Sequence, residues 1–193
     1  MPVLGDIMEK IIFLDIDGVL NDNTVNGYLN RCVDCLKKYI SDKDIKIVII
    51  SSLQSTGTVK KRQKLEKSLG EVGIKIDDFI DPNFKGNLGG VSLSNRVLGI
   101  IDYLKEHSNS EYVILDDEYK NDYKMLGLNH LEVDMWTGLE DKSLERISFK
   151  KVNLDILNRV NYSYRELGDY ELATNNLIKT LKRVLKKQED IKK

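Results

Sequence analysis

The feature that most constrains the fold is a set of three short apolar segments, each of which ends in side chains able to do chemistry. The segments and their polar ends are 10–14 with Asp15 and Asp17, 46–50 with Ser51 and Ser52, and 112–115 with Asp116 and Asp117. Segment 46–50 is uniformly apolar, which favours a parallel strand covered on both faces over a strand with one wet face. The sequence therefore predicts buried strands that deliver polar groups to their own carboxyl ends.

Amphipathic segments with helical spacing separate these strands. They cover residues 31–41, 59–69 and 95–105, and a short apolar segment at 74–80 and a glycine-rich loop at 83–90 lie between the last two. Strands that alternate with helices at this spacing predict βαβ units with right-handed crossovers. We therefore expect an α/β fold with a doubly wound parallel sheet, whose functional site lies just beyond the carboxyl ends of the strands.

Composition bounds the class of protein. The chain has 193 residues, of which 41% are hydrophobic and 32% charged, as in a soluble globular protein of one domain with a small appendage. The formal net charge of -1 excludes a chain-wide basic field for nucleic acid. No apolar run approaches the ~20 residues that span a bilayer, and the N-terminus lacks a signal pattern. We expect a cytoplasmic protein with no membrane contact.

The C-terminal part has a different character. Apolar residues keep a spacing of three or four over 154–167 and 170–184, with a turn at Gly168 and Asp169. The pattern predicts a helical hairpin over residues 151–193, after an α/β domain over residues 1–150. The hairpin resembles a single tetratricopeptide repeat, which cannot cover its own apolar face. It must pack on the α/β domain, on a second copy in a homodimer, or on a protein partner.

The aspartates at the strand ends suit metal-assisted phosphoryl transfer. A divalent cation such as Mg²⁺ prefers carboxylate oxygens, which Asp15 and Asp116 supply. Because the cation screens the repulsion between carboxylate and phosphate, Asp15 can attack phosphorus in line and form an aspartyl-phosphate. Asp17, two residues further on, can protonate the leaving oxygen and then activate water.

Other residues are candidates for binding the phosphate. Ser51 can donate its hydroxyl to the transferring phosphoryl group. A cation from a following helix or loop would neutralise the developing negative charge. We expect Arg96 in this role, with Lys85 as the alternative.

At these residues the sequence is similar to a known superfamily. The segments FLDIDGVLN, VIISS and YVILDDE resemble motifs one, two and four of the haloacid dehalogenase (HAD) superfamily of phosphohydrolases. The resemblance covers residues 11–147 and is greatest to the HAD domain found in Swiss Army Knife RNA repair proteins. It implies a HAD-like, Rossmannoid phosphatase that depends on Mg²⁺ and forms an aspartyl-phosphate.

The resemblance also implies a role for each motif residue. The implied roles are nucleophile for Asp15, acid and base for Asp17, phosphate contact for Ser51, and motif-three cation for Arg96. Ser52 is a further candidate for phosphate contact, with a structural role as the alternative. The implied metal ligands are Asp15, Asp17 through its backbone carbonyl, Asp116, and Asp117, for which a supporting contact outside the metal shell is the alternative. In one departure from the family, Leu53, Gln54 and Ser55 follow the serines where tryptophan and arginine are usual. An expected substrate-binding arginine is therefore missing.

The segments between the motifs leave no room for a large cap domain. Residues 21–44 hold a loop and one helix, and residues 52–94 hold a helix, a short strand and a loop. An open site cannot enclose a small substrate, which favours a phosphate displayed on something large. We expect a Mg²⁺-dependent phosphohydrolase that acts on RNA ends, DNA ends or nucleotides. The alternative is a catalytically weak scaffold that works through its helical hairpin.

Overall fold

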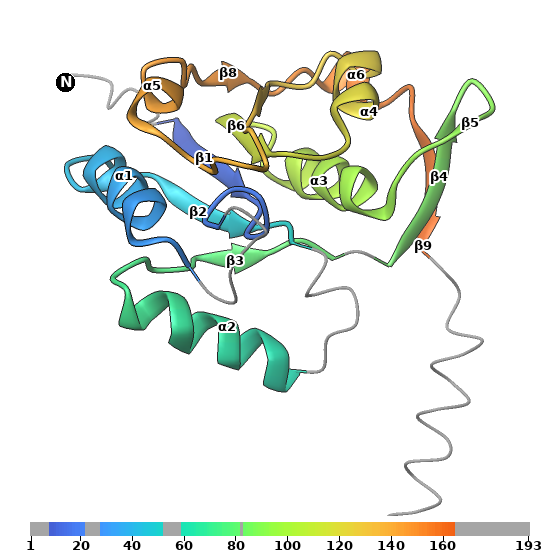
Figure 1. Cartoon of the computed structure of the whole chain (residues 1–193). Coiled ribbons are helices and arrows are strands. Elements are labelled where there is room, and N and C mark those ends of the chain that lie inside the picture. Colours follow the sequence, from blue (N-terminus) through green and yellow to red (C-terminus); the bar gives the residue numbers. More distant parts are fainter. Residues whose placement is uncertain (1–7, 22–27, 52–58, 82, 165–193) are drawn as a thin grey trace, which may run out of the picture. The chain divides into compact units, whose positions relative to one another are not determined.

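A computed structural model describes residues 8–21, 28–51, 59–81 and 83–164 (Figure 1). The chain divides into two compact units, Met1–Ser163 and Tyr164–Lys193. Of the second unit, Tyr164 belongs to the described residues and residues 165–193 do not. Within the described ranges, no helix is long and apolar enough to cross a membrane.

The main sheet has the strand order β3-β2-β1-β6-β7, and these neighbouring strands run parallel. Its strands are β1 (Glu9–Leu14), β2 (Lys46–Ile49), β3 (Asp78–Phe79), β6 (Ser110–Asp116) and β7 (His130–Glu132), while β8 (Lys150–Lys151) pairs antiparallel to β6. The chain enters the sheet at the central strand β1, adds β2 and β3 on one side, and then adds β6 and β7 on the other side. This arrangement confirms the doubly wound parallel sheet. In the register, Leu14 of β1 lies opposite both Ile49 and Leu115, so all three strands end at one edge.

Helices cover both faces of this sheet. Those between the strands are α1 (Asn30–Ile40), α2 (Val59–Glu71), α3 (Asn95–Glu106), α4 (Lys120–Met125) and α5 (Asp141–Leu144), and the first three confirm the predicted helices. Along β1, Ile11 and Phe13 belong to the core cluster that contains α3, whereas Ile12 and Leu14 belong to the cluster that contains α1. Each of these four side chains is fully buried, which contributes about 1.5–3 kcal/mol per residue.

The prediction of a glycine-rich loop at residues 83–90 was wrong, because this segment forms a β-hairpin. It consists of β4 (Phe84–Leu88) and β5 (Val91–Ser92), joined through Gly89 and Gly90. Both glycines have positive φ, which a tight antiparallel turn requires. A third strand, β9 (Asn161–Tyr164), completes a small sheet of order β5-β4-β9. No other insertion stands between β3 and α3 in the described residues, so the hairpin takes the place of a large cap.

The prediction of a helix over residues 154–167 was also wrong for residues 154–164, the part that the structure describes. A single turn, α6 (Leu154–Leu157), is capped by the Asn153 side chain, and the chain then enters β9. Leu157 and Val160 are nevertheless buried in the core that contains α3. Their three-residue spacing, typical of a helix, also fits one helical turn followed by an extended segment. The compact unit therefore continues past the expected boundary at residue 150. The rest of the expected hairpin, residues 165–193, lies outside the described residues and stays a prediction.

Candidate active site

Two aspartates meet at the carboxyl edge of the main sheet. Asp15 directly follows β1 and Asp116 ends the neighbouring β6, and the Asp15 amide donates to the carbonyl of Leu115 at 3.0 Å. The Asp15 residue is only 2% exposed and Asp116 is fully buried. Two buried carboxylates repel each other and lose hydration, so they need a cationic partner.

Arg96, in the first turn of α3, is that partner. Its Nη1 lies 2.6 Å from Asp15 Oδ2 and 2.9 Å from each carboxylate oxygen of Asp116. The side chain is 6% exposed. Burial alone would lower the pKa of Arg96, but the charges of Asp15 and Asp116 outweigh it and raise the pKa above its ordinary value. The guanidinium therefore stays charged and bridges both carboxylates.

The Asp15 carboxyl is nevertheless hard to ionise. Burial raises its pKa to about 7, with the charge of Asp116 adding to the rise and the charge of Arg96 opposing it. Burial likewise raises the pKa of Asp117 to about 6. A further positive charge at this site would favour the ionised form of both groups.

The donor set fits a hard divalent cation. Asp15, Asp116 and Asp117 each offer one carboxylate oxygen, and these atoms all lie within 4.8 Å of one another. Asp117 Oδ1 is buried and has no hydrogen-bond partner among the described residues. Its carboxylate packs on the backbone of Gly18, where any Cβ would collide with it and where φ is +73°. An orphaned carboxylate oxygen beside two others is what a Mg²⁺ ligand set would leave.

These pKa values predict how cation binding depends on pH. A protonated carboxyl cannot ligate, so Mg²⁺ must displace protons from Asp15 and Asp117. Both pKa values are raised, so affinity is full above pH 7 and falls as the pH drops through 7 and 6. We expect a loss of up to about tenfold per pH unit over this range, measured by titration calorimetry. An affinity that stays constant between pH 7.5 and 5.5 would contradict this ligand set.

Asp17 has surroundings different from those of Asp15. Its Oδ1 accepts a hydrogen bond from Asn21 Nδ2 at 3.0 Å, and Asn21 Oδ1 accepts from the Gly18 amide at 2.9 Å. The Asp17 side chain is half-buried and stands outside the group of three ligand oxygens. The turn that follows β1 therefore orients the Asp17 carboxylate through Asn21, whereas Arg96 is the partner of Asp15.

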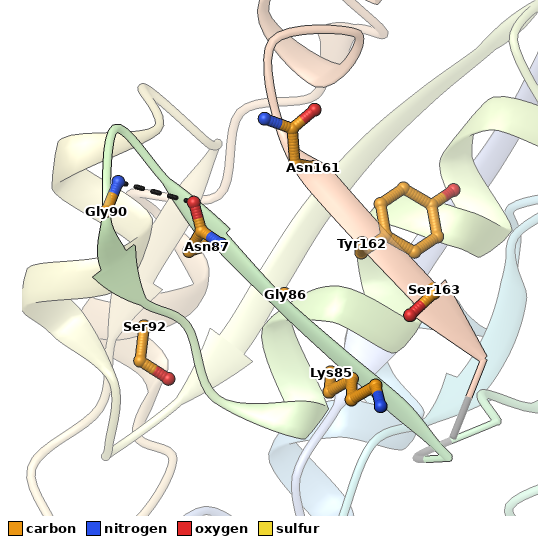
Figure 2. A pocket seen from close by; sticks show the side chains of 8 residues that line it. All are labelled: Lys85, Gly86, Asn87, Gly90, Ser92, Asn161, Tyr162 and Ser163. Atoms are coloured by element: carbon orange, nitrogen blue, oxygen red, sulfur yellow. Dashed lines mark hydrogen bonds between the residues drawn. The ribbon is translucent and has the colours of Figure 1, made fainter. Parts of the chain in front are cut away.

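The candidate phosphate-binding residues lie in different places in the structure. Ser51 is buried at the end of β2, whereas Ser52 lies outside the described residues. Lys85 is exposed on β4, where it lines a hollow of the small sheet (Figure 2). Among the described residues, Arg96 and not Lys85 contacts Asp15 and Asp116.

Sequence reasoning missed two residues around Asp116. Tyr123, fully buried in α4, donates its hydroxyl to Asp116 Oδ2 at 2.6 Å, and His130 Nε2 lies 2.9 Å from the Asp116 carbonyl oxygen. Burial raises the pKa of Tyr123 well above 10, so the hydroxyl remains a donor. Neither residue belongs to a motif or a periodic pattern, so no signal in this single sequence marks them.

The Tyr123 hydroxyl is expected to stabilise the fold measurably. Tyr123→Phe leaves the ring in place but removes one donor to a buried carboxylate, which costs about 1.5–3 kcal/mol for a charged acceptor. Chemical denaturation should show this fall in the free energy of unfolding. The control is Tyr39→Phe, because this tyrosine is only half-buried on α1. Equal, small losses in both variants would mean that Tyr123 does not support Asp116.

Tyr119 is a third residue that the sequence did not indicate. Among the described residues it is the one non-glycine residue with positive φ, at 52°, a conformation that costs a tyrosine free energy. Its ring lies over the Arg96 guanidinium at 4.8 Å, and the residue is 37% exposed. Beside it, Glu118 Oε2 lies 3.9 Å from Arg96 Nη2. Arg96 is therefore held by an aromatic face as well as by carboxylates.

Comparison with known proteins agrees with this geometry. No curated protein and no solved structure gives a significant match. Residues 11–144 match the family described as the HAD domain in Swiss Army Knife RNA repair proteins. The matched range includes β1 from Ile11 onward, all of β2 and β6, the aspartates that follow β1 and end β6, and Arg96. Since it spans more than half of the chain, the chain belongs to this family of HAD domains.

Proposed function

We propose that the protein is a Mg²⁺-dependent phosphohydrolase that acts through an aspartyl-phosphate on the phosphate of a nucleic acid end or a nucleotide. Membership of the HAD family supports a phosphohydrolase in general, and the acidic cluster can hold a metal ion. The observation that carries the proposal is the buried pair Asp15 and Asp116, bridged by Arg96 next to the orphaned oxygen of Asp117.

In the first step, the Asp15 carboxylate attacks phosphorus and the bond between phosphorus and the ester oxygen breaks. Asp17 donates a proton to that oxygen as it leaves, and the phosphoryl group is then bonded to Asp15. In the second step, Asp17 accepts a proton from water, the water oxygen attacks phosphorus, and Asp15 is released with inorganic phosphate. Together, the two steps return Asp15 and Asp17 to their starting states.

The remaining residues stabilise charge. Arg96 offsets the negative charge that develops on the phosphoryl oxygens, and Ser51, with Ser52, would donate hydroxyl groups to them. Asp15, Asp116, Asp117 and the backbone carbonyl of Asp17 would hold Mg²⁺, which reduces the repulsion between the nucleophile and the phosphate.

The proposal of a large substrate is supported by the described residues between β3 and α3. Among them the β4–β5 hairpin is the one insertion, and so short a hairpin has little with which to enclose a small molecule. The family occurs in RNA repair proteins, which supports an RNA end as the substrate. A cytoplasmic location, and a protein partner or homodimer formed through residues 151–193, stay predictions.

The test is phosphate release from a generic phosphate ester and from short RNA or DNA with a 5′- or 3′-phosphate, with and without Mg²⁺. The proposal expects Mg²⁺-dependent release, with the polynucleotide preferred. No release from any of these substrates would favour the alternative, a catalytically weak scaffold.

A substitution at Tyr119 tests the proposed role of Arg96 more specifically. Tyr119→Asn keeps a residue that tolerates positive φ but removes the ring above Arg96, so we expect kcat to fall about 3- to 30-fold. Tyr119→Phe should retain most of the activity because its ring can stack in the same way. Steady-state kinetics and thermal melting should be measured together. Equal losses of activity in both variants would show that the phenol hydroxyl, not the stacked ring, matters.

A further inference from the structure

The small sheet carries a second candidate binding site, a hollow of about 600 Å³ that includes Gly86 and Gly90 (Figure 2). The polar side chains around it come from all three strands, and they are Lys85, Asn87, Ser92, Asn161 and Ser163. Lys85, Ser92, Asn161 and Ser163 are exposed, so the hollow is shallow. Such a surface suits an extended ligand more than an enclosed small molecule.

Strand alternation decides which face of the sheet carries these side chains. Phe84 on β4 and Tyr162 on β9 pack edge to face at 5.5 Å, and the Tyr162 hydroxyl donates to Asp102 Oδ1 of α3 at 3.0 Å. Lys85 follows Phe84, and Asn161 and Ser163 flank Tyr162. They therefore project to the opposite face, away from α3.

The chemistry of the hollow favours a polyanion. None of the eight residues that line it is acidic, and Lys85 is the one charged residue among them. Amide and hydroxyl groups from the asparagines and serines supply neutral donors around that charge. Lysine, asparagine and serine are residue types that contact the phosphates and sugars of nucleic acids without reading the bases.

Close packing of the two strands fixes the positions of these donors. Gly86 lies on β4 opposite Asn161 and Tyr162 of β9, and a Cβ at Gly86 would collide with both residues. Glycine in a strand interior often marks such a close backbone approach. Lys85 and Asn87 are therefore held at a set distance from Asn161 and Ser163.

The hollow is near the catalytic edge. Ser92 precedes Arg96 by four residues, so their Cα atoms are at most about 14 Å apart even in an extended chain. In Figure 1 the small sheet stands at the end of the main sheet toward which β2 and β3 run. Arg96 contacts Asp15, so a nucleic acid strand with its terminal phosphate beside these two residues would span the distance to Ser92 with a few nucleotides.

We infer that Lys85, Asn87, Asn161 and Ser163 form a binding site for the sugar–phosphate backbone of a single-stranded nucleic acid whose terminal phosphate lies at Asp15. This inference rests on the proposed function and makes it more specific. It assigns the end of a polynucleotide, rather than a free nucleotide, as the substrate.

The experiment compares Lys85→Gln with a matched control on the other face of the same sheet. Lys105→Gln makes the same charge change, and Lys105 lies over the Tyr162 ring at 4.5 Å from the side of α3. The substrates are a single-stranded RNA of ten nucleotides with a terminal phosphate, and p-nitrophenyl phosphate. For the RNA, Lys85→Gln should raise KM about 5- to 10-fold at low salt and reduce the salt slope of binding by about one.

Further measurements distinguish a loss of RNA binding from a loss of activity or stability. Lys85→Gln should leave the melting temperature unchanged, and Lys105→Gln should leave both KM for the RNA and hydrolysis of p-nitrophenyl phosphate unchanged. Equal KM values for both variants and the wild type would overturn the inference. Fluorescence anisotropy with the same RNA lacking its terminal phosphate measures binding to the hollow of the small sheet without turnover. If nothing is hydrolysed but Lys85→Gln still weakens binding, the proposed function fails and the binding site stands.

Discussion

We expect Asp15→Asn to abolish phosphate release and to leave the fold in place. The amide is nearly the same size as the carboxylate, and its oxygen can still accept a hydrogen bond from Arg96, which lies 2.6 Å from Asp15 Oδ2. It is not nucleophilic, however, and it carries no charge for a cation. We expect a loss of about 10⁴-fold or more in kcat, the scale seen when a nucleophile is removed.

The matched control for this variant is Asp34→Asn, because Asp34 is exposed on α1 and makes the same chemical change outside the site. Its kcat and melting temperature should equal those of the wild type. Activity of Asp15→Asn within a few-fold of the wild type, with the fold intact, would mean that Asp15 is not the nucleophile.

Arg96→Met should produce the largest change in stability. The guanidinium is the cation that bridges the buried Asp15 and Asp116, and its removal leaves like charges without compensation. Losing one partner of a buried ion pair costs about 3–5 kcal/mol. In metal-free buffer the free energy of unfolding, measured with denaturant, should fall by this amount. Phosphate release should fall as well, because in the proposed mechanism Arg96 also stabilises the phosphoryl group.

Added Mg²⁺ should stabilise Arg96→Met more than it stabilises the wild type. It should restore much of the lost stability of Arg96→Met, because a divalent cation can take over the charge that Arg96 supplied. It should stabilise the wild type less, since Arg96 already contacts three of the carboxylate oxygens. Arg146→Met, a change at an exposed arginine, serves as the control. If Mg²⁺ stabilises Arg96→Met no more than the wild type, Arg96 and the cation do not share these ligands.

The aspartates at the carboxyl edge of the main sheet could be predicted because they follow from local patterns. Asp15 and Asp116 directly follow runs of buried apolar residues, and parallel strands place their carboxyl ends together. The sequence favoured Arg96 over Lys85 because Arg96 opens the amphipathic helix α3, and the structure places its guanidinium against Asp15. These arguments need only the spacing of apolar residues and the order of the strands.

The small sheet and the aromatic residues of the site could not be predicted in this way. β4 contains Lys85, Gly86 and Asn87, which are unfavourable for strands, and its pairing with β9 depends on a segment more than 70 residues away. Leu157 and Val160 have helical spacing, but burial against α3 decides their structure. Tyr119 and Tyr123 lie in a polar segment, and only the folded chain brings them to Arg96 and Asp116.

The central claim is that Asp15 carries the phosphoryl group during turnover, and trapping that group tests it most directly. The wild type, with Mg²⁺ and a substrate whose terminal phosphate is ³²P-labelled, should be quenched with acid within one turnover and digested. The account predicts label on the peptide that contains Asp15, and no labelled peptide from Asp15→Asn. Release of labelled phosphate with label on no peptide, or on a peptide without Asp15, would contradict the account.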